Sequence, residues 1–449
     1  MKNHTDVTSE YLEKARPGEG KYRKRIVIVE CYSSAVNYIH DIRELGFEPV
    51  LLEQYQPEEE REKVREMNDA VYAFNGDLRP MVIMAKESYE ETLEMVRRLM
   101  PVLILPGSDP GTELALRLSF DLKLKNNPPG IFWNIREKKA MQEALKSAGL
   151  RFIRSYTICS EEDALRLYRA EEGRCVVIKP SQAAGSTGVY ICGSEREVCE
   201  AYRVNSAFVR KRDRKGEKVI LQEYISGDEY AVDTISCKGR HVALFGMKYI
   251  KRRCNGFGKI YDTDLYFSPD DPSMDELLEY CFQVLTCLGI QYGPVHSEIM
   301  IDDSGPVLIE VNPRPAGAFQ RYSFQDKVMV NHETAVALDS YLMDPESFFG
   351  KYPVRMHLKQ PAAVRQICIP EEIFVKRVKL KERLSRLRSF DYVIEHGENC
   401  IYPRTTDLDT NGGMIYLTAD DPEIIDEDLG VICRLEKEGL HELYDWYRT

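Results

Sequence analysis

Two glutamates and an asparagine near the middle of the chain are spaced so that they could hold a divalent cation. Glu298 lies in one run of alternating apolar and polar residues, and Glu310 and Asn312 lie in the next. The turn signal Asp302-Asp303-Ser304-Gly305 separates the runs and predicts a β-hairpin. Like charges that face each other destabilise a strand pair, so a cation is expected between the carboxylates. Hard oxygen ligands of this kind suit Mg²⁺. The alternative is a solvent-facing strand with hydrated acids.

The turn residues also predict the register of this hairpin. A three-residue loop would place Gly305 in its left-handed last position. Asp302 would then pair with Pro306, and Glu298 would lie opposite Glu310. The strand period of two predicts one polar and one apolar face. The polar face would hold His296, Glu298, Met300, Leu308, Glu310 and Asn312, and the apolar face Ile299, Ile301, Val307, Ile309 and Val311.

Two lysines upstream of the hairpin lie among apolar residues. Lys138 falls in the first turn of a helix expected over 136–148, where the helix dipole disfavours a cation. It either covers apolar surface with its stem or neighbours an anion at the helix start. Lys179 stands in an apolar strand, 175–180, before the small-residue loop Ser181 to Gly188. Backbone N–H groups of such a loop can close over phosphates, although an ordinary turn fits the residues equally well.

A further pair of strands, expected over 219–234, carries polar groups on either side of the turn Ser226-Gly227-Asp228. The run 247–253 then adds four positive charges. The polar groups of the two strands are Gln222, Glu223 and Glu229.

The elements around these residues predict an α/β chain of several domains. Strand, helix and strand follow one another from Arg25, which indicates a parallel sheet, and no glycine fingerprint of a dinucleotide site is present. The expected parts are a polar arm, an N-terminal α/β domain, a central domain with a lid at about 155–225, and a small α+β domain: residues 1–24, 25–130, 131–355 and 356–449.

Two local predictions concern the outer parts of the chain. Asp109-Pro110 is typical of a helix start, so capping is the favoured role for Asp109, with substrate contact by its loop as the alternative. A basic amphipathic helix is expected over 371–387.

Composition narrows the class of protein. Of 449 residues, 43% are hydrophobic, which fits a sizeable core, and the net charge of −12 argues against general nucleic-acid binding. The 12 cysteines form no CxxC pair or zinc spacing, and the N-terminus is polar and charged. No apolar run is long enough for a membrane span. We therefore expect a cytoplasmic protein with reduced thiols.

Taken in order, the motifs over 136–342 resemble the ATP-grasp superfamily. Five of them match: a first-turn lysine, a strand lysine before a small-residue loop, Gln-Glu-Tyr-Ile, a later glutamate, and Glu…Glu-x-Asn-x-Arg. The resemblance implies an ATP-grasp fold, with ATP bound by Lys138, Lys179, Ser186, Gln222, Glu223, Tyr224, Ile225 and Glu229. It implies Mg²⁺, or Mn²⁺, on Glu298, Glu310 and Asn312, and it makes Arg314 the catalytic arginine.

The outer regions are most similar to the L-amino-acid ligase branch, through 106–115, Gly397 and Gly412-Gly413. This resemblance implies an ATP-dependent carboxylate–amine ligase that forms an amide through an acylphosphate. Its partners would be small amino acids or carboxylates, without nucleic acid or membrane, and a homodimer is compatible with it. The alternatives are a carboxylase-like enzyme for another small carboxylate, for which no biotin-lysine segment is seen, or a nucleotide-binding scaffold without turnover.

Overall fold

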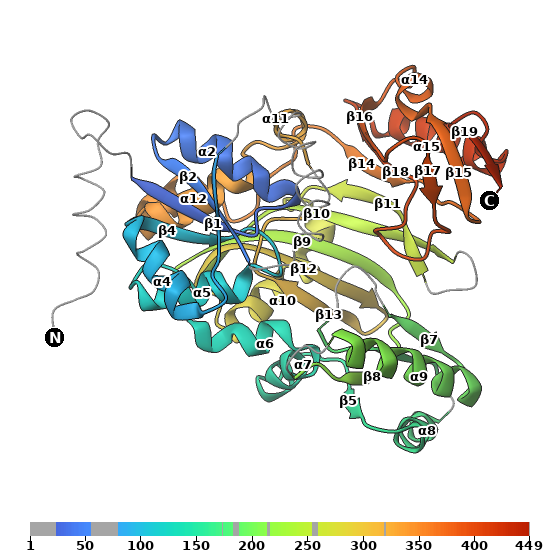
Figure 1. Cartoon of the computed structure of the whole chain (residues 1–449), viewed down its shortest axis with the longest axis horizontal. Helices are drawn as coiled ribbons and strands as arrows, with labels where there is room; N and C mark the ends of the chain where they lie inside the picture. The colour runs from blue at the N-terminus through green and yellow to red at the C-terminus, as the bar shows by residue number, and fades with distance from the viewer. Residues whose placement is uncertain are drawn as a thin grey trace.

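The computed structural model describes residues 24–54, 80–172, 174–182, 188–212, 216–253, 259–317 and 320–448, which form four β-sheets with helices packed against them. In Figure 1 the N-terminal sheet lies at the left, a small sheet with α8 and α9 at the lower right, and the C-terminal strands at the upper right. A long central sheet joins these parts. No helix within the described ranges is long and apolar enough to cross a membrane.

The N-terminal sheet is parallel, as the alternation of strands and helices predicted. Its order is β3-β2-β1-β4, and each pairing is parallel. β1 is apolar and buried over four successive residues, which is typical of a strand covered on both faces. The elements are β1 (Arg25–Val29), η1 (Ser33–Asn37), α2 (Tyr38–Glu44), β2 (Glu48–Glu53), β3 (Met81–Met84), α4 (Tyr89–Arg98), β4 (Pro101–Pro106) and α5 (Thr112–Asp121).

A second sheet, in the order β5-β8-β6-β7, is antiparallel and includes the predicted hairpin around the small-residue loop. Ser186 of that loop lies outside the described residues. The helix expected over 136–148 is divided in two, because Glu137 adopts an extended conformation and caps the second helix. The elements are η2 (Pro129–Ile131), α6 (Phe132–Arg136), α7 (Lys138–Ser147), β5 (Ser155–Ile158), α8 (Glu161–Ala170), β6 (Val176–Pro180), β7 (Tyr190–Cys192), α9 (Glu195–Arg212) and β8 (Val219–Glu223).

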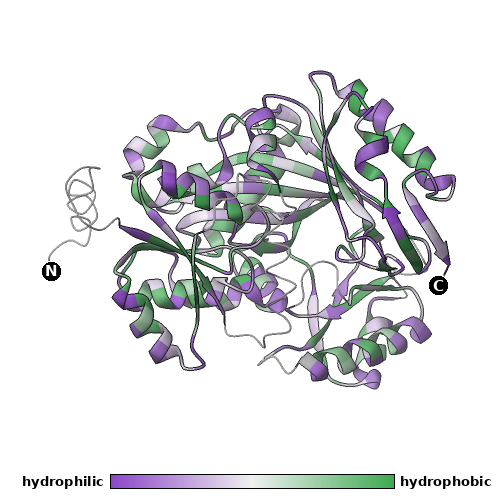
Figure 2. Ribbon diagram, turned by 45° about the horizontal axis from the view of Figure 1, so that its top comes forward, coloured by the Kyte–Doolittle hydropathy of each residue, from purple (hydrophilic) through white to green (hydrophobic). Residues whose placement is uncertain are grey.

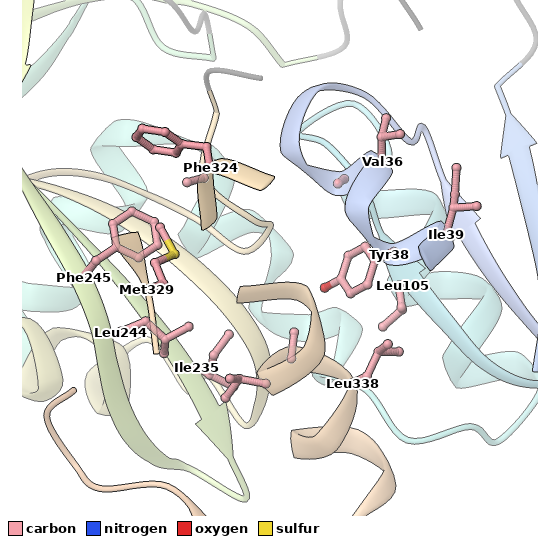
Figure 3. Packing of buried hydrophobic residues seen from close by; sticks show 14 of the residues in the cluster. Val36, Tyr38, Ile39, Leu105, Ile235, Leu244, Phe245, Phe324, Met329 and Leu338 are labelled. Carbon is pink, nitrogen blue, oxygen red and sulfur yellow. The ribbon is translucent and has the colours of Figure 1, made fainter. Parts of the chain in front are cut away.

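The central sheet has the order β13-β12-β9-β10-β11-β14-β18-β16, with antiparallel pairings. Helix α10 packs its apolar residues on one face. On the other face, Tyr38 of α2 and Leu338 of α12 share a buried cluster with Ile235 of β9 (Figure 3). Its elements are β9 (Asp228–Cys237), β10 (Arg240–Arg253), β11 (Lys259–Phe267), η3 (Pro272–Met274), α10 (Asp275–Cys287), β12 (Tyr292–Asp302), β13 (Gly305–Asn312), α11 (Tyr322–Val328), α12 (Glu333–Leu342) and α13 (Pro345–Lys351).

The C-terminal part adds three strands to this sheet and forms a small sheet of its own, β17-β15-β19. The helix predicted over 371–387 is wrong for its first half, which is strand β15, because burial there alternates: Ile373 and Val375 are buried and Lys376 is exposed. Figure 2 shows hydrophobic residues along inner strands and hydrophilic residues on outer helices. The elements are β14 (Ala362–Gln366), β15 (Ile373–Val378), α14 (Leu380–Leu384), β16 (Phe390–Glu395), β17 (Cys400–Tyr402), β18 (Gly413–Thr418), α15 (Pro422–Lys437) and β19 (Tyr444–Arg448).

Candidate active site

Glu298 and Glu310 face each other across the β12–β13 hairpin, as predicted, but the register beside the turn differs. Asp302 pairs with Gly305 and not with Pro306, so the loop has only two residues. The register then shifts between Glu298 and its neighbour, which returns Glu310 to the position opposite Glu298. A β-bulge in the second strand thus supplies the extra residue that was expected in the loop.

The bulged residue, Ile309, changes which side chains share a face. Leu308, predicted on the polar face, packs with Ile299 in the cluster beneath α10. Val307, predicted on the apolar face, packs with Met300 instead. The predicted faces were therefore wrong for β13 on the turn side of the bulge, because strict alternation does not continue through an inserted residue. The predicted faces of β12 were correct there, since Ile299 and Ile301 share one cluster and Met300 lies in another.

Two side chains cover β13, the edge strand, at Leu308. The backbone N–H of Leu308 donates to the Tyr280 hydroxyl at 3.0 Å, and its carbonyl accepts from Gln142 Nε2 at 2.8 Å. Gln142 Oε1 in turn accepts from the backbone N–H of Ile153 at 2.7 Å. These bonds protect the edge and fix α7, which carries Gln142, against the hairpin.

Lys138 reaches Glu310 from the first turn of α7. Its Nζ lies 2.8 Å from Glu310 Oε2, and its backbone N–H donates to the Ser181 carbonyl at 3.2 Å. Asn312 Nδ2 donates to the other oxygen, Glu310 Oε1, at 3.1 Å. Burial alone would raise the pKa of Glu310, but Lys138, with help from Lys179 and Asn312, lowers it to about 2. In this structure the cation beside Glu310 is therefore a lysine.

Lys179, in β6, is a second buried lysine near the same acids. Burial and the nearby Lys138 ammonium lower its pKa to about 8, while Glu310 and Glu298 oppose that shift. Two buried ammonium groups close enough to repel each other form an arrangement that an anion would stabilise.

Arg314, just beyond β13, forms a bidentate ion pair with Asp109. Arg314 Nε lies 3.2 Å from Oδ1 and Nη2 lies 3.1 Å from Oδ2. The capping role favoured for Asp109 is wrong, because α5 begins at Thr112 after Gly111 and has no side-chain cap. Gly111 lets this loop approach β1, since a Cβ there would lie 2.3 Å from the Val29 carbonyl oxygen. Burial would lower the pKa of Arg314, but Asp109 raises it overall.

Glu229, in β9, pairs with Lys251 of β10, whose individual role the sequence did not reveal. Lys251 Nζ lies 2.6 Å from Glu229 Oε1 and 4.2 Å from the centre of the Tyr261 ring. Burial raises the pKa of Glu229, and Lys251 partly offsets this effect. Strand alternation would have placed Lys251 on the same face of the sheet as Tyr249. It would not have identified Glu229 as the partner of Lys251.

His296 links three polar groups of the sheet face. Its Nδ1 lies 2.9 Å from Asp233 Oδ1, and its Nε2 lies 3.2 Å from the Tyr249 hydroxyl and 3.7 Å from Glu298 Oε1. Burial would lower the pKa of His296, but Asp233, followed by Glu298, raises it to about 10. Sequence reasoning placed His296 on this face without a role and missed Asp233, which lies on the neighbouring strand.

In the segment 222–225, which was predicted to bind ATP, the first two side chains already have partners within the protein. Gln222 is buried and donates from Nε2 to Ser155 Oγ at 2.6 Å. Glu223 Oε2 lies 2.8 Å from Nη2 of Arg154. Tyr224 and Ile225 complete the segment and are half-buried.

The geometry of Glu298, Glu310 and Asn312 fits a divalent cation that takes further ligands from a substrate. Two opposed carboxylates and a carboxamide supply hard oxygens, and Mg²⁺ is commonly held by one or two carboxylates together with substrate phosphates. Across the described ranges, no three or more His, Cys, Asp and Glu side chains gather as in a metal site built from protein alone.

Comparisons with known proteins give the fold. Residues 173–321 match the ATP-grasp domain family. The chain is 28% identical over 354 residues to dapdiamide A synthase of Enterobacter agglomerans. The aligned region covers 75% of this chain and 80% of that protein. The L-amino acid ligase from Bacillus licheniformis superposes with a TM-score of 0.72 at 16% identity, over 96% of this chain and all of that one. The biotin carboxylase domain of Hydrogenobacter thermophilus 2-oxoglutarate carboxylase was solved with MgADP, ADP and bicarbonate. It superposes with a TM-score of 0.63 at 16% identity, over 95% of this chain and 91% of that one. The fold is the ATP-grasp fold that the motif order predicted.

Proposed function

We propose that this ATP-grasp protein is an ATP-dependent carboxylate–amine ligase that joins amino acids, or an amino acid and a related acid, through an acylphosphate. The main support is the opposed pair Glu298 and Glu310, with Lys138 on Glu310 and Arg314 just beyond the same strand. Similarity to dapdiamide A synthase and to an L-amino acid ligase supports amino acids as substrates.

The reaction would have two steps. A carboxylate oxygen of the donor attacks the γ-phosphorus of ATP, and ADP leaves with the electrons of the broken P–O bond. The acceptor amine then attacks the acyl carbon, the C–O bond to phosphate breaks, and the nitrogen gives up a proton. Anions meet in the first step, so the site must be cationic. A unit charge pair at ~4 Å contributes about 4 kcal/mol at an effective dielectric near 20, so several are needed.

The cations of the site would serve this first step. Lys138 and Lys179 would hold the phosphates, and Arg314 would hold the transferred phosphoryl group. Mg²⁺ or Mn²⁺, when bound, would neutralise phosphate charge from Glu298, Glu310 and Asn312. Lys138 would then pass from Glu310 to a phosphate. The adenosine would lie against Gln222, Glu223, Tyr224, Ile225 and Glu229. Ser186, the other residue of the predicted ATP-binding set, lies outside the described residues.

Two alternatives are less favoured. The similarity to dapdiamide A synthase and to an L-amino acid ligase does not favour a carboxylase-like enzyme for another small carboxylate. A scaffold without turnover would not need this set of paired acids and cations. A cytoplasmic location, a homodimer, and partners limited to small molecules remain our predictions.

The test measures ADP release with the twenty amino acids, singly and in pairs, with mass analysis of products. When the productive donor carries labelled carboxylate oxygen, one label should be found in the released phosphate. Hydroxylamine should also trap the activated donor as a hydroxamate. Turnover in which the displaced labelled oxygen is found in AMP or water and not in phosphate contradicts the acylphosphate, and absence of both ADP release and hydroxamate contradicts the ligase.

A further inference from the structure

The peptide group between Pro315 and Ala316, directly after Arg314, is held by a side chain on each side. Its carbonyl accepts from Arg314 Nη1 at 3.0 Å. Its N–H donates to both carboxyl oxygens of Glu333, each at 3.1 Å. The peptide bond is trans, so the two contacts lie on opposite sides of one rigid plane. Glu333 therefore fixes the orientation of the carbonyl that contacts the Arg314 guanidinium.

Two groups of the protein orient the guanidinium of Arg314. Asp109, on the loop between β4 and α5, binds Nε and Nη2, and the Pro315 carbonyl binds Nη1. These bonds fix different edges of the planar group, so together they determine where its remaining N–H donors point. Removal of either anchor would let the guanidinium turn about the bonds of its side chain.

Glu333 itself has a fixed position. It is the first residue of α12 and is fully buried. Its backbone N–H donates to Gln325 Oε1 at 3.3 Å. The hydroxyl of the next residue, Thr334, donates to Asp41 of α2, and α12 packs through Leu338 in the cluster of Figure 3. The carboxyl group is therefore a rigid acceptor for the turn that carries Arg314.

Packing alone does not account for a carboxyl group at this position. Glu333 has no ion pair among the described residues, and burial together with the Asp233 carboxylate raises its pKa. The Ala316 N–H, His296 and Arg314 oppose that rise. A buried ionisable group without a paired charge is destabilising. The raised pKa favours the neutral acid, whose carbonyl oxygen still accepts from Ala316, so the hydrogen bond and not the charge is the feature to test.

We propose that Glu333 is a positioning residue for Arg314 and acts through the peptide group between Pro315 and Ala316. This inference rests on the proposed ligase function, in which Arg314 holds the transferred phosphoryl group. Glu333 would affect the rate of phosphoryl transfer, because a guanidinium that has turned away must be reoriented before the transition state. ATP affinity, which is assigned to other residues, would change little.

The experiment compares Glu333→Met and Glu333→Gln with the parent in hydroxamate formation from ATP, donor and hydroxylamine. Methionine has a similar length but only a weak acceptor, whereas glutamine keeps a carbonyl oxygen. We expect Glu333→Met to lower the rate about 10- to 100-fold and to leave the KM for ATP within about twofold. Glu333→Gln should stay within about threefold of the parent. Glu346→Met, in the exposed first turn of α13, is the matched control and should match the parent.

Action through Arg314 is tested by repeating the comparison in an Arg314→Lys background. Lysine lacks the planar fork that the peptide carbonyl orients, so Glu333→Met should cost less than about threefold there. Losses that multiply would overturn the inference, and so would a parental rate in Glu333→Met or equal losses in the Met and Gln variants. If Glu333→Met does not fold, Glu333→Asp replaces it with the same expectations, because the shorter side chain withdraws the acceptor.

A measurement without turnover separates this inference from the ligase function. Pro313 and Pro315 have no N–H, so few amides of the turn can contribute to hydrogen exchange there. Exchange of the Ala316 amide should be at least about tenfold faster in Glu333→Met than in the parent, and unchanged in Glu333→Gln. Parental exchange in Glu333→Met would overturn the inference. A parent that shows the expected exchange but forms no hydroxamate would contradict the ligase function instead.

Discussion

The two ends of the polar sheet face differ in charge although they are built alike. At each end a bulged strand carries a carboxylate, Glu310 on β13, which is partly buried, and Asp264 on β11, which is buried. Glu310 accepts from Lys138 and Asn312, whereas Asp264 has no ion pair within the described residues. Both ends thus have a β-bulge, and the side chains from the neighbouring helix and strands determine the net charge around each carboxylate.

This difference indicates which end of the sheet face suits anionic groups. α7 and β6 bring lysines to the β13 end, and the Asp109 loop holds Arg314 there. The β11 end instead receives tyrosines from β10 and β11. Phosphates and a donor carboxylate therefore suit the first end.

The largest expected effect breaks the cationic end. Glu310→Gln should lower turnover at least about a hundredfold, since a proposed metal ligand is lost. It should also lower the free energy of unfolding by about 3 kcal/mol, because Lys138 and Lys179 then face each other without the carboxylate. Activity assays and denaturant melts measure both effects, with Glu279→Gln on the exposed face of α10 as control. Parental turnover in Glu310→Gln would refute the assignment of this end.

The next effect, on stability, concerns the other end. Burial raises the pKa of Asp264 to about 7, so between about pH 4 and 7 the folded chain keeps a proton that the unfolded chain releases. Stability of the ligand-free parent therefore falls as pH rises through this window. Asp264→Asn removes that loss and should be more stable than the parent by about 2–4 kcal/mol at pH 8, but not at pH 4. Thermal melts across this range decide; a variant less stable than the parent at pH 8 would show that the two ends are not opposite in charge balance.

A smaller expected effect is the pH dependence of ATP affinity, which would test whether Lys179 binds phosphate at the cationic end. In the ligand-free protein the pKa of Lys179 is lowered to about 8 by burial and by Lys138, and bound phosphates would favour the charged form. ATP affinity should therefore be constant below pH 7 and fall above pH 8, at most about tenfold per pH unit. Lys179→Arg stays charged and should lose this dependence. Calorimetric titrations from pH 6.5 to 9.5 test it, and a flat parental profile would exclude Lys179 from phosphate binding.

Local patterns in the sequence predicted much of the fold. Apolar strands and amphipathic helices identified the parallel sheet, and the turn at Asp302 identified the hairpin. The pairing of Glu298 with Glu310 was predicted correctly although the predicted loop length was wrong. A bulge in β13 compensates for the shorter two-residue turn. A basic, leucine-containing stretch was mistaken for one helix where Ile373 to Val378 form a strand, since tertiary burial overrode the local pattern.

The site could be predicted only where its residues share a local motif. Arg314 meets Asp109, 205 positions away in the chain, and Lys251 meets Glu229 from the neighbouring strand. Nothing in the local sequence connects such partners, because sheet order and loop approach decide them. Lys138 was likewise predicted to lie beside an anion. The expected anion was a phosphate of ATP, whereas in the structure it is the Glu310 carboxylate.

The bulge at Ile309 has a consequence for how the length of this hairpin can vary. On either side of it, each residue of β13 is committed to a face by its pairing with β12. Loss of a residue among Pro306 to Leu308 would turn the remainder of the strand over relative to the turn. Loss of Ile309 alone would leave Leu308 opposite Ile299 and Glu310 opposite Glu298. The hairpin thus has one position at which a single codon can be gained or lost without separating the two carboxylates.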